Sequence, residues 1–105
     1  MNTEELKQVV KQSVKKMYTV SEYTNNQKVI KVFHDFAESI FDEYEGYLNG
    51  NGDNLEYIID DIRNFITLGS DEIEDWIDDI DFTFEDYKEY VYISFLVFKY
   101  ALNNR

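Results

Sequence analysis

Apolar side chains recur at intervals of three and four residues along most of this chain, which is the spacing of one face of an α-helix. The chain contains no proline, the residue that most often interrupts a helix. At 105 residues, 44% of them hydrophobic, it is long enough for one core and too short for two ordinary domains. We therefore expect an all-α fold, a single-domain compact helical bundle of about five helices that spans residues 1–105.

Polar breaks separate the stretches with helical spacing and give their expected bounds. The five predicted helices are residues 4–18, 27–48, 55 to about 68, 71 to about 80, and 84 to about 102. Two glycines and three Asn or Asp residues make Asn49–Asp53 the strongest break. Residues 19–26 have the composition of a polar turn, which Val20 and Tyr23 could anchor to the core.

Capping residues stand at several of these ends. Thr3 and Ser70 are expected to cap the first and fourth helices, because a hydroxyl accepts a hydrogen bond from a free backbone N–H. Thr83, with Asp86 three residues later, resembles a capping box at the start of the fifth helix. Gly69 stands where a left-handed residue would end the third helix.

The inward faces of the third and fourth helices follow from the same spacing. They are expected to be Ile58, Ile59, Ile62, Phe65 and Ile66, and Ile73, Trp76, Ile77 and Ile80. The fifth segment is harder to orient, since Val91–Phe98 is apolar almost all round and could pass for a buried strand. We assign it as helix because the whole segment is too long for a strand and has no second strand to pair with.

Several classes of protein are disfavoured by the composition. There is no cysteine, so disulfides and thiolate metal sites are excluded. The first residues lack the basic stretch and apolar run of a secretory signal, and no window has the roughly 18 to 20 apolar residues of a membrane span. A cytoplasmic protein is the expectation.

Catalytic and metal sites find little support. The single His34 has Glu38 one helical turn later, but no second histidine or nucleophile accompanies them. Oxygen-bearing residues in 49–60 and 79–90 imitate calcium loops, yet both segments lack the required glycine. We therefore expect no enzyme, no cofactor and no metal.

The charge of the chain is its strongest anomaly, with a formal net charge of −12. Residues 1–31 carry six lysines against three glutamates, or +3, and residues 91–105 add +2. Residues 32–90 carry nineteen carboxylates against Arg63 and Lys88, or −17. The negative charge is thus concentrated in the middle and later chain.

Within that region, Asp71, Glu74, Asp75 and Asp78 share one face of the fourth helix and line up over roughly 10 Å. Like charges at this spacing destabilise a helix by a few tenths of a kcal/mol per pair, which suggests a binding role. The same ridge could instead be a solvated surface kept for solubility. The candidate partner-binding residues are Asp71, Glu72, Glu74, Asp75, Asp78, Asp79, Asp81, Glu85, Asp86, Glu89, Asp60, Asp61, Tyr57 and Tyr87.

Tyrosine is abundant, with nine in the chain. They cannot all be buried with satisfied hydroxyls, and tyrosines among carboxylates are typical of a protein-binding surface with aromatic anchors.

With residues 71–89 in view, the chain resembles the small acidic inhibitors encoded by phages, including anti-CRISPR proteins and other DNA mimics. The resemblance covers size, charge and helical character. It implies a non-catalytic inhibitor that blocks the basic nucleic-acid-binding surface of a host nuclease or CRISPR effector in the host cytosol, without binding nucleic acid itself. One alternative is an immunity protein that neutralises a nuclease toxin. Another is an adaptor in which the first or last helix mediates oligomerisation, and a homodimer stays open.

Overall fold

Helices account for most of the described chain. The structure, a computed structural model, describes residues 2–52, 54–67 and 71–104, except for the side chains of 66, 67, 71–73 and 76. The helices are α1 Thr3–Tyr18, the short 3₁₀ helix η1 Val20–Glu22, α2 Gln27–Leu48, α3 Leu55–Thr67, α4 Asp71–Ile80 and α5 Phe84–Asn103. The described residues contain no strand, so the expected all-α fold is confirmed, and the segment 91–98 is helical.

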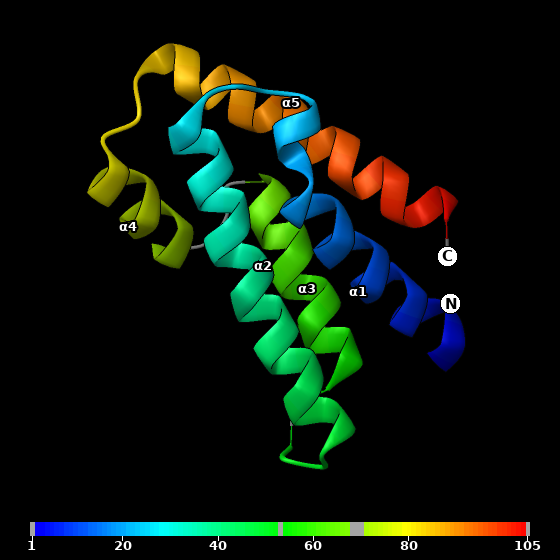
Figure 1. The fold of residues 1–105 in the computed structure, drawn as a ribbon. Helices are drawn as coiled ribbons and strands as arrows, with labels where there is room; N and C mark the ends of the chain where they lie inside the picture. Colours follow the sequence, from blue (N-terminus) through cyan, green and yellow to red (C-terminus); the bar gives the residue numbers. More distant parts are fainter. Residues whose placement is uncertain (1, 53, 68–70, 105) are drawn as a thin grey trace.

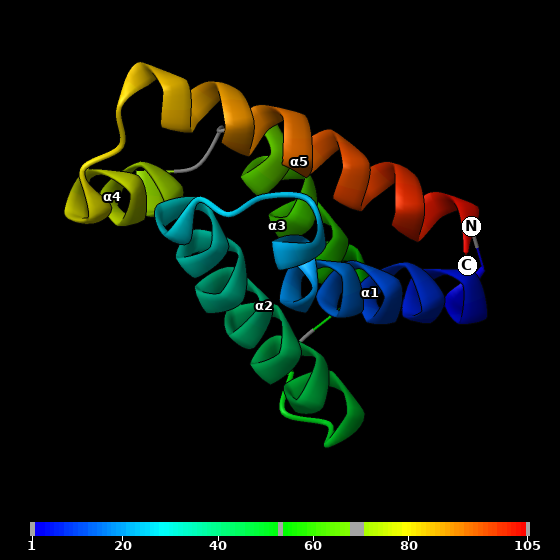
Figure 2. The ribbon, with the colours of Figure 1, turned by 45° about the horizontal axis from the view of Figure 1, so that its top comes forward.

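The helices form one bundle with a crossing helix over it (Figures 1 and 2). α1, α2 and α3 pack on one another, and α5 crosses their upper ends and packs mainly against α1. α4 stands at the side of α2, and the two termini lie near each other at the far end of the molecule from α4. The Cα radius of gyration is 13.3 Å, as expected for a single compact domain of this length.

The first helix begins one residue earlier than predicted. Asn2, rather than Thr3, is its cap, and the Asn2 side chain accepts a hydrogen bond from the Glu5 N–H at 2.9 Å. Asn and Thr are both good caps, so periodicity alone could not decide between neighbours. Asn26 caps α2 in the same way, and the predicted capping box of Thr83 and Asp86 is present at α5.

The predicted breaks are confirmed where the chain is described. Gly50 and Gly52 adopt left-handed φ angles of 73° and 93°, which reverse the chain between α2 and α3. In the first connection Val20 is fully buried as proposed, but Tyr23 is 48% exposed and does not anchor the segment to the core. The expected roles of Gly69 and Ser70, and the inward positions Ile66, Ile73 and Trp76, lie outside the described residues and side chains.

Four aromatic rings from three helices form the centre of the core. Phe33 of α2 lies 5.2 Å from Phe65 of α3 and 5.3 Å from Tyr90 of α5, between ring centroids. Phe36 stacks on Phe65 at 3.8 Å. Tyr90 is fully buried, and this burial raises the pKa of its hydroxyl. The hydroxyl donates a hydrogen bond to the Phe65 carbonyl, so the buried polar atom is satisfied. This cluster holds α2, α3 and α5 together.

The end of α4 provides a stability prediction. Asp81 has a left-handed φ of 64°, and hydrogen bonds from the Asp81 and Phe82 N–H groups back to Asp78 and Ile77 form a Schellman cap. Glycine adopts this conformation without steric cost, so Asp81→Gly is expected to raise the free energy of unfolding by about 0.5–1 kcal/mol. Asp79→Gly, inside the last turn, is the matched control and should lower it by about 1 kcal/mol. Urea denaturation of both variants measures this, and a loss of stability in Asp81→Gly would contradict the cap.

Candidate protein-binding surface

The acidic face of α4 points away from the core. Ile77 is 1% exposed on the inner side of the helix, whereas Glu74, Asp75, Asp78 and Asp79 are exposed. The helical period therefore places a row of carboxylates on the outer side, as expected for the described part of the ridge. Asp71 and Glu72 belong to this helix, but their side chains lie outside the description. We call Glu74, Asp75 and Asp78 the acidic ridge.

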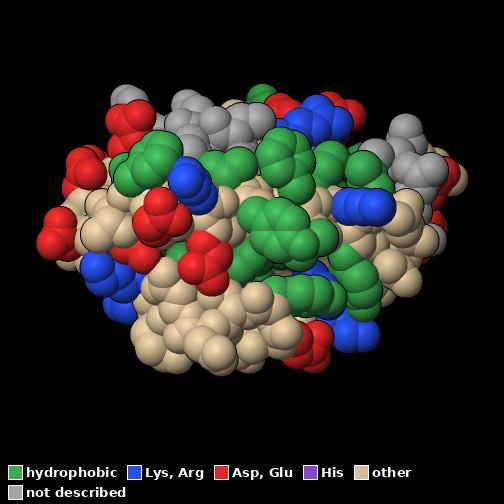
Figure 3. Space-filling view, turned by 90° about the horizontal axis from the view of Figure 1, so that it is seen from above, with side chains coloured by type: hydrophobic (Ala, Val, Ile, Leu, Met, Phe, Trp, Pro, Cys, Tyr) green, Lys and Arg blue, Asp and Glu red, His purple; other side chains and the backbone are tan. Residues whose placement is uncertain are grey.

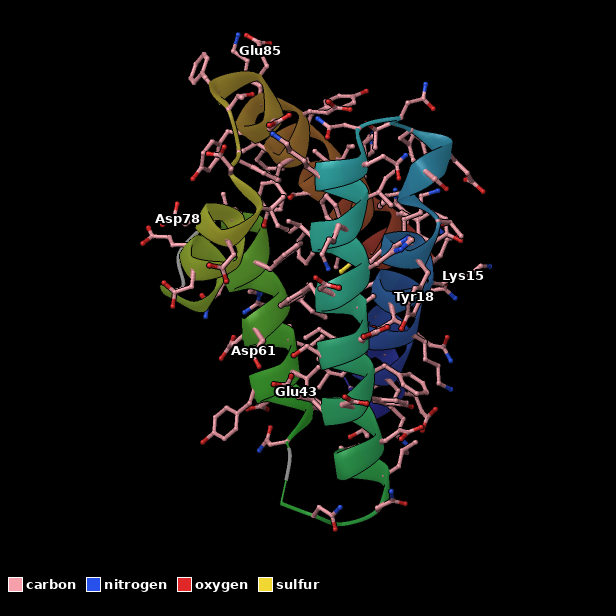
Figure 4. All side chains as sticks on the ribbon, turned by 60° about the vertical axis from the view of Figure 1, so that its left-hand side comes forward. Lys15, Tyr18, Glu43, Asp61, Asp78 and Glu85 are labelled. Atoms are coloured by element: carbon pink, nitrogen blue, oxygen red, sulfur yellow. The ribbon has the colours of Figure 1, made fainter. Side chains whose placement is uncertain are left out.

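Neighbouring helices extend the negative surface. Figure 4 shows Asp78 of α4 and Asp61 of α3 pointing to one side of the molecule, while Lys15 of α1 lies at the opposite edge. On α3, Asp60 is exposed and Asp61 half-buried, and Tyr57 is 70% exposed. Asp61 and Asp78 thus lie on a different side of the fold from Lys15.

Basic residues neutralise only part of this surface. Arg63 lies 3.4 Å from Asp60 and Lys88 lies 3.3 Å from Glu85, each within its own helix. Lys31 pairs with Asp35 at 2.8 Å beside Asp79, in a shallow hollow between α2 and α4. Within the described part of the chain, the three carboxylates of the acidic ridge have no lysine or arginine nitrogen within 4 Å. The described bases therefore neutralise Asp60 and Glu85 in part and leave the ridge without an ion pair.

Three of the proposed partner-binding residues make contacts within the protein instead. Asp86 is 8% exposed and accepts hydrogen bonds from the Thr83 N–H at 2.8 Å and the Asn26 amide at 2.6 Å. Glu89 accepts from Thr24 and, at 3.3 Å, from Asn26. Tyr87 is half-buried with its ring against Phe82. Asp86 and Glu89 join α5 to the segment before α2, a long-range contact that local sequence spacing does not reveal. We remove all three residues from the candidate surface.

The environment of Asp86 predicts a pH effect. The Thr83 N–H, followed by the Asn26 amide, lowers the pKa of Asp86 from 3.8 to about 2. Because the carboxylate is favoured in the folded state, its stabilising effect is present above the unfolded pKa and is lost as the pH falls from about 4 to about 2. Asp86→Asn should be less stable than the parent at neutral pH, and the difference should shrink towards pH 2. Urea midpoints of both proteins at several pH values measure this; a difference independent of pH would contradict it.

An aromatic band on α5 was not foreseen. Phe84, Tyr92 and Phe95 are 72%, 63% and 62% exposed, and the Lys88 ammonium lies 4.7 Å from the centre of the Phe84 ring. Figure 3 shows hydrophobic side chains gathered along the face that α5 crosses, with acidic side chains mainly at the end where α4 and the start of α5 lie. Because the helix is apolar on nearly every side, hydropathy could not tell its outer face from its inner one. Such exposed aromatic patches commonly mark protein contacts.

The described side chains offer little support for a catalytic or metal-binding site. His34 is half-buried, with Nε2 3.1 Å from the Tyr18 carbonyl oxygen, and it forms no hydrogen bond or ion pair with Glu38. The described residues contain no group of three His, Asp or Glu side chains arranged to hold a metal ion. In the same residues, every helix is too short or too polar to cross a bilayer.

These features define the class as an all-α bundle with an acidic ridge and a neighbouring aromatic band. No family model matches the chain, and neither a curated protein nor a solved structure matches it.

Proposed function

We propose that this protein is a non-catalytic inhibitor, acting in the cytosol, that binds the basic nucleic-acid-binding surface of a nuclease or CRISPR effector. The observation that carries the proposal is the acidic ridge, whose three carboxylates are exposed on one helix face and form no ion pair with any base that the structure describes. A duplex carries one charge per ~1.7 Å of axis, so a groove that binds it attracts closely spaced carboxylates. Electrostatic attraction of this kind gives fast association and strong salt dependence.

Specificity would come from exposed aromatic side chains on the neighbouring helices. Tyr57 on α3 and the α5 band offer exposed rings of the type that supply most of the binding energy in protein interfaces. Carboxylates alone would favour any basic protein, whereas rings need a matching pocket on the target.

The acidic ridge and the exposed aromatic side chains also fit an immunity protein that binds one nuclease toxin. The exposed Tyr57, with Asp60 and Asp61 on the same helix, is the observation that favours it. The two functions use one mechanism and differ in the target.

Affinity capture tests the proposal. The protein is immobilised on a column, bacterial lysate is passed over it at low salt, and the retained proteins are eluted with duplex DNA. We expect nucleic-acid-binding proteins to be retained, to be released by the DNA, and to be lost at high salt. A column carrying Asp75→Lys and Asp78→Lys is the control for the ridge. Retention that neither DNA nor salt disturbs, equally strong on the control column, would overturn the proposal.

A further inference from the structure

A second surface lies between α1 and α2, away from α4. Val10, Val14 and Tyr44 form the floor of a groove of about 270 Å³, and Phe41, 45% exposed, stands at its side. Lys11 and Lys15 complete the lining. The groove is apolar at its centre, and its basic edge belongs to α1.

The other edge of the groove is acidic. Glu38, Asp42 and Glu45 are exposed on α2 and flank Phe41 at one helical turn or less. The Tyr18 carbonyl oxygen at the end of α1 lies 3.1 Å from His34 Nε2, and α1 and α2 run in opposite directions (Figure 1), so Lys15 and Lys11 lie beside the turns of α2 that follow His34. The lysines and the carboxylates therefore lie at similar heights on opposite sides of the same apolar strip.

Neither edge is neutralised within the part of the chain that the structure describes. Among the described residues, Lys11 and Lys15 form no ion pair, although the protein carries 22 carboxylates. The same holds for Glu38, Asp42 and Glu45. An apolar strip with unpaired charges of opposite sign on its two edges resembles the seam of a coiled coil, where such edge charges choose the partner.

We propose that the occupant of this groove is a second copy of the chain, related by a two-fold axis that runs along α2. Rotation about such an axis leaves the position of each residue along α2 unchanged and places the basic edge of one copy over the acidic edge of the other. The Lys11 and Lys15 edge of one copy then faces the Glu38 to Glu45 edge of the other, and Phe41 packs against Phe41 of the second copy. The opposite, antiparallel arrangement would place lysine over lysine.

The overall charge favours this face over the others. Two copies at −12 each repel one another, and the repulsion is strongest where the acidic surfaces of α3 and α4 approach. The α1 side is the positive part of the chain, so contact through α1 and α2 keeps the acidic ridges apart. The ridges of both copies stay free in this dimer, which makes the inference independent of the proposed function.

Sedimentation of charge-swapped variants tests the dimer. One variant carries Lys11→Glu and Lys15→Glu, and the other carries Glu38→Lys and Glu45→Lys. The wild type should sediment as a concentration-dependent dimer, and each variant alone should dimerise at least about tenfold more weakly, because attraction becomes repulsion on both edges. An equimolar mixture should recover the dimer, since both edges are again complementary.

Every other outcome overturns the proposal. A wild type that stays monomeric at millimolar concentration excludes the dimer and leaves the groove to another partner. Variants that dimerise like the wild type, or a mixture that does not recover, exclude this arrangement. Phe95→Ala is the matched control on α5, and loss of the dimer in that variant alone would move the interface to the aromatic band.

Discussion

A protein with Asp75→Lys and Asp78→Lys is expected to bind its target at least tenfold more weakly than the parent, while it folds at least as stably. The binding loss follows because both carboxylates are exposed on α4 and form no ion pair among the described residues, and reversed charges repel a basic groove. The fold should gain slightly, because like charges at three and four residues destabilise a helix by about 0.2–0.5 kcal/mol per pair. Titration of the captured target and thermal unfolding measure the two effects.

A matched control separates the ridge from net charge. Glu4→Lys and Glu22→Lys change the charge by the same amount at exposed positions of α1 and η1. This control should keep most of the affinity for the target. It should lose only the small part that comes from the general attraction between an acidic protein and a basic target. Equal losses in the two proteins would mean that total charge, and not the ridge, determines binding.

Phe33→Ala is expected to have the largest effect on folding. The ring is fully buried and contacts Phe65 and Tyr90, so its removal leaves a cavity at the junction of three helices. Substitutions of this kind cost about 3–5 kcal/mol, which is a large fraction of the roughly 5–15 kcal/mol by which small domains are stable. Urea denaturation followed by circular dichroism at low temperature measures the loss.

The same side-chain truncation on the surface serves as the control. Phe95 is 62% exposed on α5, so Phe95→Ala should change the free energy of unfolding by less than about 1 kcal/mol. If Phe95→Ala destabilised the protein as much as Phe33→Ala, the inner and outer faces of α5 would be assigned the wrong way round.

Helix positions could be read from the sequence because the signals that set them are local. The period of the apolar residues in α2 and the break at residues 49–53 predicted the bounds of this helix. The capping pair Thr83 and Asp86 predicted the start of α5. The outer row of α4 followed from the same period, because Ile77 and Ile80 leave only one face for the carboxylates. Local spacing is sufficient where one face is clearly apolar.

Contacts between distant segments could not be read in this way. Asp86 belongs to an acidic stretch, yet it is bound by Asn26, sixty residues earlier, and only the fold brings them together. The outer face of α5 was equally hidden, because exposed Tyr92 and buried Tyr90 stand two positions apart with the same chemistry. Partner residues on such a helix are set by tertiary packing rather than by hydropathy.

Competition between this protein and nucleic acid for the captured target tests the central claim most directly. Affinity is measured with the target free and with the target saturated with duplex DNA, at several salt concentrations. We expect mutual exclusion, so that bound DNA abolishes binding and binding of the free target weakens steeply with salt. A stable ternary complex of target, DNA and this protein would contradict the account, because the acidic ridge could not then occupy the nucleic-acid site.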